Sequence, residues 1–347
     1  MKTLKLSTKL VLLLSGSLLG LVFFGTYSAW LKWHTVQDCV RLEGNSVVMD
    51  QIGDTVHELQ KERGRSSGFL NSKGAKFSSE LTAQRQDTDR HLERLQELLK
   101  TFDAAALGAA FNDAFKTGMA ILAQLPARRA AISALQVTGA DSLAHYTQTI
   151  AALLDIIVEM QHLSEDSIIA EGILGYVNFL QAKEQAGIER AILTGVFTQD
   201  KFIGETYGNW SKTMAAQETF LRVFNGFATS AQIAFLRERV SGDAVDAVLR
   251  VRKIALDKHT AGGFGVAPAA WFDASTQRID FMKDVEDRLT ADYHVNVTRI
   301  QQAAERAFHL FTALALFVLL STIAFGYWVI RSIVRPLRGA ADALLAG

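Results

Sequence analysis

Two long stretches without a charged residue most constrain how this chain can fold. No Asp, Glu, Lys or Arg occurs between Leu10 and Leu31, or between Ala307 and Ile330. Each stretch exceeds the roughly 20 apolar residues that a helix needs to cross a bilayer. We therefore predict transmembrane helices over residues 10–33 and 307–330.

The first stretch has one alternative interpretation, a cleaved signal peptide, because Tyr27-Ser28-Ala29 resembles a cleavage site. Its apolar core is longer than the roughly 7–15 residues of a signal peptide, which favours an uncleaved anchor. Lys and Arg flank both spans on their outer sides, and such residues stay in the cytoplasm. We therefore predict a two-pass membrane protein with residues 1–9 and 331–347 in the cytoplasm and residues 34–306 on the far side of the membrane.

The charge balance and the reactive residues exclude several functions. The chain has 36 basic and 36 acidic residues, and the part outside 10–330 holds six basic residues and one acid, so 30 basic and 35 acidic residues remain inside it. A mildly acidic exterior argues against nucleic-acid binding. The single Cys39 excludes disulfide and thiolate-metal frameworks. No two of the eight histidines have helical spacing for a metal, and we find no catalytic constellation. We expect no enzyme, metal or cofactor.

The region between the two spans is predicted to be helical throughout. It has only two prolines, Pro126 and Pro268, and its apolar residues recur at helical spacing. The first helix is predicted to run to about Leu70 and the last to begin at Pro268. The remaining predicted helices cover 78–104, 109–136, 141–162, 165–197, 201–228 and 230–258. The predicted fold class is all-α, and so many helical residues favour two adjoining bundles over one.

A segment of the chain is repeated 127 residues later. Residues 62–70 (ERGRSSGFL) align without gaps with residues 189–197 (ERAILTGVF). Both contain Glu-Arg, a small residue, a hydroxyl four residues after the arginine and a glycine five after it. The repeat predicts two related helical units that face one another.

The arginines of this repeat, Arg63 and Arg190, are candidate anion ligands. Helical spacing surrounds each with apolar, small and uncharged polar residues and places no carboxylate on its own face. An arginine in such surroundings needs an anion to offset its loss of hydration. Two other interpretations remain open at this stage: solvent-exposed arginines, or pairs with acids from other helices. Arg65 differs, because Glu62 lies three residues earlier and predicts an ion pair within the helix.

Three motifs together resemble the NIT family, the nitrate- and nitrite-sensing domain of bacterial signalling proteins. They are residues 59–64 (LQKERG), the segment from Ala182-Lys183-Glu184 to Glu189-Arg190-Ala191, and the stretch from Trp271-Phe272 to Ile279. They occur in the family's order, and the resemblance covers about residues 50–290. It implies two four-helix bundles, with the ligand held by arginines at their interface.

The resemblance implies that Arg63 and Arg190 bind the ligand, together with a third arginine from a later helix. Arg250 and Arg252 both qualify, and we choose Arg250. A further cation can stand beside the first arginine in the family, and Gly64 occupies that place here. Nitrate is a planar monoanion, and the planar guanidinium can pair with it through two donors in a way that lysine cannot reproduce.

The segment after the second span, Arg331-Ser332-Ile333-Val334-Arg335-Pro336-Leu337, resembles the start of a HAMP signal-relay module. Only its first helix fits within residues 331–347. The alternative is a short basic anchor with a helical tail.

Together with these resemblances, the sequence predicts a transmembrane receptor of a bacterial inner membrane whose periplasmic region, 34–306, binds nitrate or nitrite. As a homodimer, this receptor would relay the signal through the second span and HAMP to an unidentified cytoplasmic partner. Two alternatives stay open. One is a helical chemoreceptor-type sensor for another small anion or organic acid. The other is a membrane-anchored structural module that binds no ligand.

Overall fold

The computed structural model describes residues 6–160, 166–329, 331, 332 and 336, without side chains at 6–14, Ser17 and Asn45. All regular secondary structure in this described part is helical, which confirms the predicted all-α class. The predicted HAMP start, 331–347, lies largely outside the described residues, so it stays a prediction.

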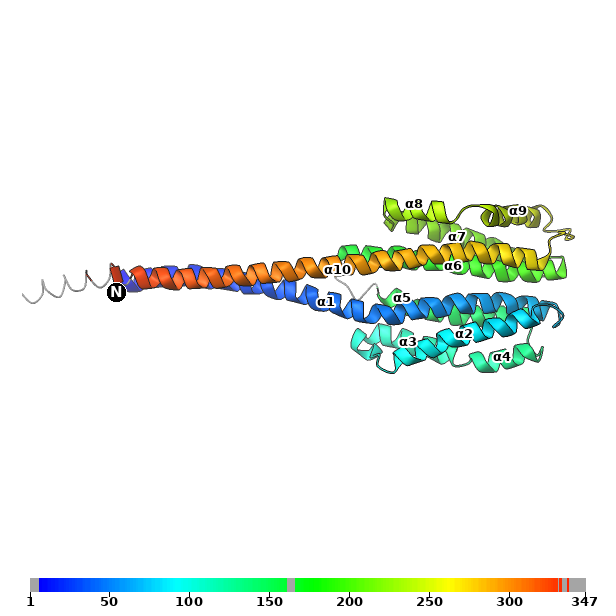
Figure 1. Cartoon of the computed structure of the whole chain (residues 1–347), viewed down its shortest axis with the longest axis horizontal. Helices are drawn as coiled ribbons and strands as arrows, with labels where there is room; N and C mark the ends of the chain where they lie inside the picture. Colours follow the sequence, from blue (N-terminus) through cyan, green and yellow to red (C-terminus); the bar gives the residue numbers. More distant parts are fainter. Residues whose placement is uncertain (1–5, 161–165, 330, 333–335, 337–347) are drawn as a thin grey trace, which may run out of the picture. The chain divides into compact units, whose positions relative to one another are not determined.

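Ten α-helices and one short 3-10 helix make up the described part (Figure 1). In the first half of the chain they are α1 (Leu6–Asn71), α2 (Ser78–Leu99), η1 (Ala104–Leu107), α3 (Ala109–Leu122), α4 (Leu125–Ser133) and α5 (Gly139–Glu159). In the second half they are α6 (Ser167–Gln199), α7 (Thr206–Phe227), α8 (Ser230–Arg239), α9 (Asp243–Asp257) and α10 (Pro268–Val329). As predicted, the last helix begins at Pro268.

Two helices predicted as continuous are each divided in the structure. The segment 109–136 forms α3 and α4, because Pro126 stands in the first turn of a new helix, where its missing N–H is tolerated. The segment 230–258 forms α8 and α9, which meet at Gly242 with φ +92°. A residue with a side chain is disfavoured at that angle, so the glycine allows the break.

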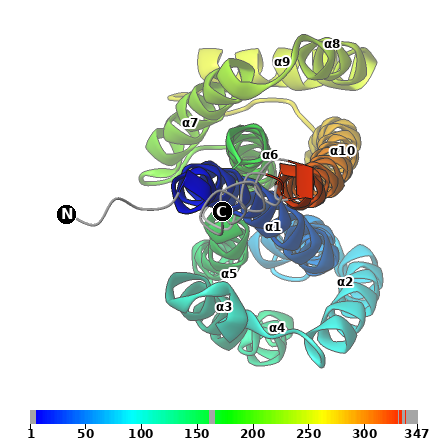
Figure 2. The same ribbon diagram turned by 90° about the vertical axis from the view of Figure 1, so that its left-hand side faces the viewer.

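The chain divides into two compact units, which are described separately. One comprises residues 1–41 and 297–347, and the other comprises 42–296. In the larger unit, α2, α3 and α4 lie beside α1 and α5, whereas α7, α8 and α9 lie beside α6 and α10 (Figure 2). The two halves of this unit therefore meet through α1, α5, α6 and α10.

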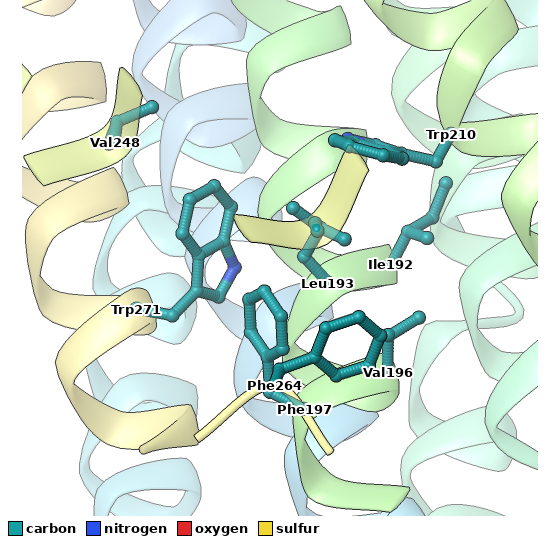
Figure 3. Close-up of a cluster of buried hydrophobic side chains, with 9 residues drawn as sticks. Ile192, Leu193, Val196, Phe197, Trp210, Val248, Phe264 and Trp271 are labelled. Atoms are coloured by element: carbon teal, nitrogen blue, oxygen red, sulfur yellow. The ribbon is translucent and has the colours of Figure 1, made fainter. Parts of the chain in front are cut away.

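α6 supplies the hydrophobic core of the second half along its whole length. Its last turns contribute Phe197, which contacts Phe264 and Trp271 edge to face with ring centres 5.3 and 5.8 Å apart (Figure 3). Its middle contributes Phe179, which packs on Phe224 of α7. Burial of such large side chains contributes about 1.5–3 kcal/mol each.

The smaller unit exposes many large apolar side chains. Phe23 and Phe24 of α1 are 71% and 67% exposed, and Phe317 and Leu320 of α10 are 68% and 64% exposed. Among the described residues, α10 alone contains a window apolar enough for a membrane span, with mean hydropathy 2.2. The predicted span 10–33 is helical in α1, but it begins among residues whose side chains are not described.

Candidate functional site

Arg63 of α1 and Arg190 of α6 are both fully buried where the two halves meet. The helices approach closely here, since the Ser67 hydroxyl donates to the carbonyl of Ala191 at 3.0 Å. Arg190 itself donates through Nη2 to the carbonyl of Gln60, 2.7 Å away on α1. The structure thus brings together the two arginines of the sequence repeat.

Glycines make room for both guanidinium groups. A Cβ atom at Gly187 of α6 would lie 2.7 Å from Nη2 of Arg63. A Cβ atom at Gly64 of α1 would lie 3.3 Å from Nε of Arg190 and 2.7 Å from the ring of Phe272. Gly64 therefore accounts for the missing second cation beside Arg63, because no larger residue fits there without displacing its neighbours.

Arg63 is paired with a carboxylate from the other half. Its Nη1 and Nη2 donate to the two oxygens of Glu184, at 2.5 and 3.0 Å, and Nη1 also donates to Thr147 of α5 at 3.1 Å. Gln60 donates to the same carboxylate at 2.8 Å. Of the interpretations left open for Arg63, the structure therefore shows the pair with an acid from another helix.

Arg190 has no carboxylate partner among the described residues. Besides Gln60, it donates to the Thr276 hydroxyl of α10 at 2.8 Å, and its guanidinium lies over the Phe272 ring, 5.0 Å from the centre. Burial, and then the charge of Arg63, lower the pKa of Arg190 to about 9. A lowered pKa means that this site disfavours a positive charge on Arg190, and the charges of Asp280 and Glu184 offset only part of this effect.

Both arginines keep one donor without an acceptor. The Nε groups of Arg63 and Arg190 are buried, and no acceptor among the described residues reaches them. Buried polar groups are almost always hydrogen-bonded, and an unsatisfied one costs about 1–3 kcal/mol, more when it is charged. Two such donors on adjacent helices are suited to a shared anionic acceptor.

The glutamates of the repeat point away from this site, each toward its own half. Glu62 accepts from Nε and Nη2 of Arg129, both at 2.7 Å, and from the Tyr146 hydroxyl at 2.7 Å. The predicted Glu62–Arg65 pair is wrong, because Arg129 from α4 takes the carboxylate and Arg65 donates to Gln84.

Glu189 has equivalent surroundings in the second half. It accepts from Nε and Nη2 of Arg252, at 2.6 and 2.5 Å, and Arg278 of α10 lies 3.5 Å away. In both halves the glutamate is held by arginines inside its own half, while the arginine that follows it faces the other half.

Arg250 does not join Arg63 and Arg190. It is exposed on α9, whereas Arg252, on the more apolar face, is bound to Glu189. The sequence interpretation assigned no role to Glu184, Thr147 or Phe272, which complete the surroundings of the two arginines. Glu184 and Phe272 lie within motifs that had been noted, but their proximity to the arginines depends on helix packing.

A cavity of about 350 Å³ opens beside the arginines, one turn further along both helices. Ser67 and Asn71 of α1 line it, together with Ala191 and Gly195 of α6. A larger cavity of about 430 Å³ lies among α2, α3 and α4 and is mainly apolar; its one arginine, Arg129, is already bound to Glu62 and Asp89. The smaller cavity is lined by Lys201 and by neither Arg63 nor Arg190.

Comparison with known proteins identifies the family of the chain. Residues 54–294 match the family model NIT, described as nitrate and nitrite sensing. The chain belongs to this family. It is 26% identical to the nitrate regulatory protein of Klebsiella oxytoca over 258 residues, which are 74% of this chain and 64% of that protein. The chain thus spans less than two thirds of this curated relative.

The solved structure of the NasR transcription antiterminator is also similar to this NIT protein. The TM-score is 0.69 at 25% identity, and the match covers 82% of each chain.

Proposed function

We propose that the chain senses nitrate or nitrite by binding one anion between Arg63 and Arg190, where two four-helix bundles face each other. The observation that carries this proposal is the buried Arg190 cation, which lacks a carboxylate partner, together with the free Nε donors of both arginines. Family membership supports the choice of ligand. A planar oxyanion has the shape and the acceptors to satisfy both Nε groups at once.

Titration of the full chain in detergent with nitrate and nitrite, followed by calorimetry, tests the proposal. Wild type should bind at least one of them, and Arg63→Ala and Arg190→Ala should each weaken binding at least about tenfold, because each removes a charge-assisted donor. Formate and acetate in the same titration show whether the site prefers nitrate and nitrite or also binds the carboxylates of organic acids. Binding that is absent in wild type, or unchanged in both variants, contradicts the proposal.

Arg250→Ala decides the remaining choice among the arginines. Because Arg250 is exposed on α9, we expect this variant to bind nitrate as wild type does. A loss of binding would restore Arg250 to the ligand set.

We further propose that the protein is a membrane receptor whose sensor region, 34–306, is periplasmic. Support comes from the exposed apolar side chains within residues 15–41 and 297–329 and from the hydropathy of α10. Side chains such as Phe23 and Phe317 are compatible with lipid and costly in water. In this scheme ligand binding shifts α10 against α1, and the HAMP-like segment passes the shift to a cytoplasmic partner in a homodimer.

Cysteine labelling in intact cells tests this topology. The variant Cys39→Ser/Ser241→Cys carries its single thiol between α8 and α9, where position 241 is exposed. A membrane-impermeant maleimide should label it without lysis. The matched control Cys39→Ser/Ser7→Cys, at the predicted cytoplasmic end, should react only after lysis. Equal labelling of both variants in intact cells would contradict the two-pass arrangement.

A further inference from the structure

The anion site contains a fixed negative charge as well as two positive ones. Arg63, Arg190 and Glu184 are all at most 3% exposed. Of these, Arg63 and Glu184 neutralise each other, and Arg190 has no partner of opposite charge among the described residues. The net charge of these three groups is therefore +1.

The charges around these three groups belong to separate clusters. Lys183, the neighbour of Glu184, is bound to Glu286 of α10. Glu62 is bound to Arg129 of its own half, and Glu189 is shared by Arg252 and Arg278, which leaves one positive charge within the second half. Arg65 and Asp280 also influence Arg190, with opposite signs, and both are partly exposed to solvent. The excess of one positive charge at Arg63, Arg190 and Glu184 thus remains.

Glu184 is held too firmly to make way for a ligand. Both of its oxygens accept from Arg63, and Gln60 adds a third hydrogen bond. Moving a buried carboxylate away from these donors would leave it unpaired in an apolar interior, which is strongly unfavourable. The free Nε donors offer an incoming anion a place that does not require Glu184 to move.

We propose that Glu184 is a specificity-determining residue, which holds the net charge of the site at +1 and so restricts it to one monovalent anion. This inference rests on the proposed function. A monovalent anion brings the summed charge of Arg63, Arg190 and Glu184 to zero. A divalent anion such as sulfate leaves one negative charge uncompensated in a low-dielectric interior, where such a charge is costly.

The variant Glu184→Gln tests the proposal, because glutamine keeps the size and one acceptor while it removes the charge. The full chain in detergent is titrated with nitrate and with sulfate at equal ionic strength. We expect nitrate affinity to rise by about tenfold or more, and sulfate affinity to rise by about the square of the nitrate factor, since Coulomb energy scales with ligand charge. The preference for nitrate over sulfate should therefore fall.

Glu62→Gln is the matched control. Glu62 is an equally buried carboxylate bound by an arginine, but it faces the first half and not the anion site. The Glu62→Gln variant should have the same ratio of nitrate affinity to sulfate affinity as wild type.

The outcomes separate this inference from the proposed function. If wild type binds neither nitrate nor nitrite, the function itself fails. If wild type binds nitrate and Glu184→Gln binds it equally or more weakly, with the preference over sulfate unchanged, Glu184 only orients Arg63 and the inference is overturned.

If Glu184→Gln does not fold, the inference can be tested on the wild-type protein instead. An infrared difference spectrum between nitrate-bound and free protein, with ¹³C-labelled glutamate, should show no glutamate becoming protonated or leaving its paired state. Appearance of a protonated-carboxyl band would overturn the inference, because it would mean that Glu184 gives up its charge to the ligand.

Discussion

Single side chains at the anion site differ sharply in how their charge is balanced. Arg63 has a bidentate carboxylate partner, whereas Arg190 has only a carbonyl, a hydroxyl and an aromatic face. Desolvation of an ion costs several kcal/mol even after relaxation, and neutral dipoles recover only part of it. Replacement of the two arginines should therefore have opposite effects on the empty protein.

Arg190→Met should raise the free energy of unfolding of the nitrate-free protein by about 1–2 kcal/mol, because an uncompensated buried cation is removed. Arg63→Met should lower it by about 3–5 kcal/mol, because Glu184 is left buried without its partner. Urea unfolding in nitrate-free buffer measures both. Destabilisation of similar size in the two variants would show that Arg190 is compensated after all.

Gly187→Ala should destabilise the protein by about 1–3 kcal/mol through overpacking and should also weaken nitrate binding. The added methyl group would press on Nη2 of Arg63, which Glu184 and Thr147 hold in place. Gly172→Ala, on the same helix with nothing within 4 Å, is the control and should be neutral or stabilising by up to about 1 kcal/mol. Calorimetric unfolding and nitrate titration give the two readouts.

The residues of the site were only partly predictable. The Glu-Arg repeat, read on helical faces, identifies Arg63 and Arg190 because the information is local. The partners are not local, since Glu184 lies 121 residues from Arg63 and Thr276 lies 86 from Arg190. The resemblance implied only an arginine from a later helix, and Arg250 was chosen because Arg252 lies on the more apolar face of its helix. In the structure that apolar face is the one that points inward, and it carries Arg252 to Glu189.

At the scale of helices, α1 and α10 are joined by a charged cluster centred on His294. The His294 ring lies 3.3 Å from Glu43 and 3.2 Å from Asp50, both on α1. Although burial alone would lower it, hydrogen bonds and the charges of Asp50 and Glu43 raise the pKa of His294 above its ordinary value of 6.5. Burial raises the pKa of Asp50.

The stabilising contribution of His294 should fall as the pH rises from about 6.5 through its raised pKa. A histidine whose pKa is higher in the folded state stabilises the fold while protonated, and this contribution is lost on deprotonation. His57 and His145 have lowered pKa values, so their contributions to stability rise with pH around 6.5 and oppose that of His294. Thermal unfolding between pH 6 and 9 should therefore show that the stability of wild type relative to His294→Gln decreases as the pH rises. An unchanged slope in the variant would assign the effect elsewhere.

The helices themselves were more predictable than their breaks. Periodicity located almost every helical segment, since burial of one face is a local pattern. It did not separate α3 from α4 or α8 from α9, because the apolar spacing continues across both junctions. Pro126 and Gly242 can be recognised in the sequence as helix breakers, but a single proline or glycine is compatible with either a kink or the start of a new helix.

In the larger unit as a whole, the charged interior lies between the two halves. Nitrate bound between α1 and α6 should therefore slow amide hydrogen exchange around residues 60–67, 184–194 and 272–276. The outer helices α2 to α4 and α7 to α9 should change little, because the ligand contacts none of them. Exchange measured by mass spectrometry, with Arg190→Ala as the control, checks this. Protection spread evenly over the outer helices would place the ligand elsewhere.

The position of α6 limits how this sensor can evolve. The helix carries Lys183, Glu184, Glu189 and Arg190 among and between the residues that it contributes to the two hydrophobic clusters of the second half. A substitution of these charged residues should therefore alter ligand recognition and folding together. Thr147 of α5 and Thr276 of α10 contact the arginines through uncharged hydroxyl groups. Drift in ligand preference among descendants of this protein should therefore begin at these threonines.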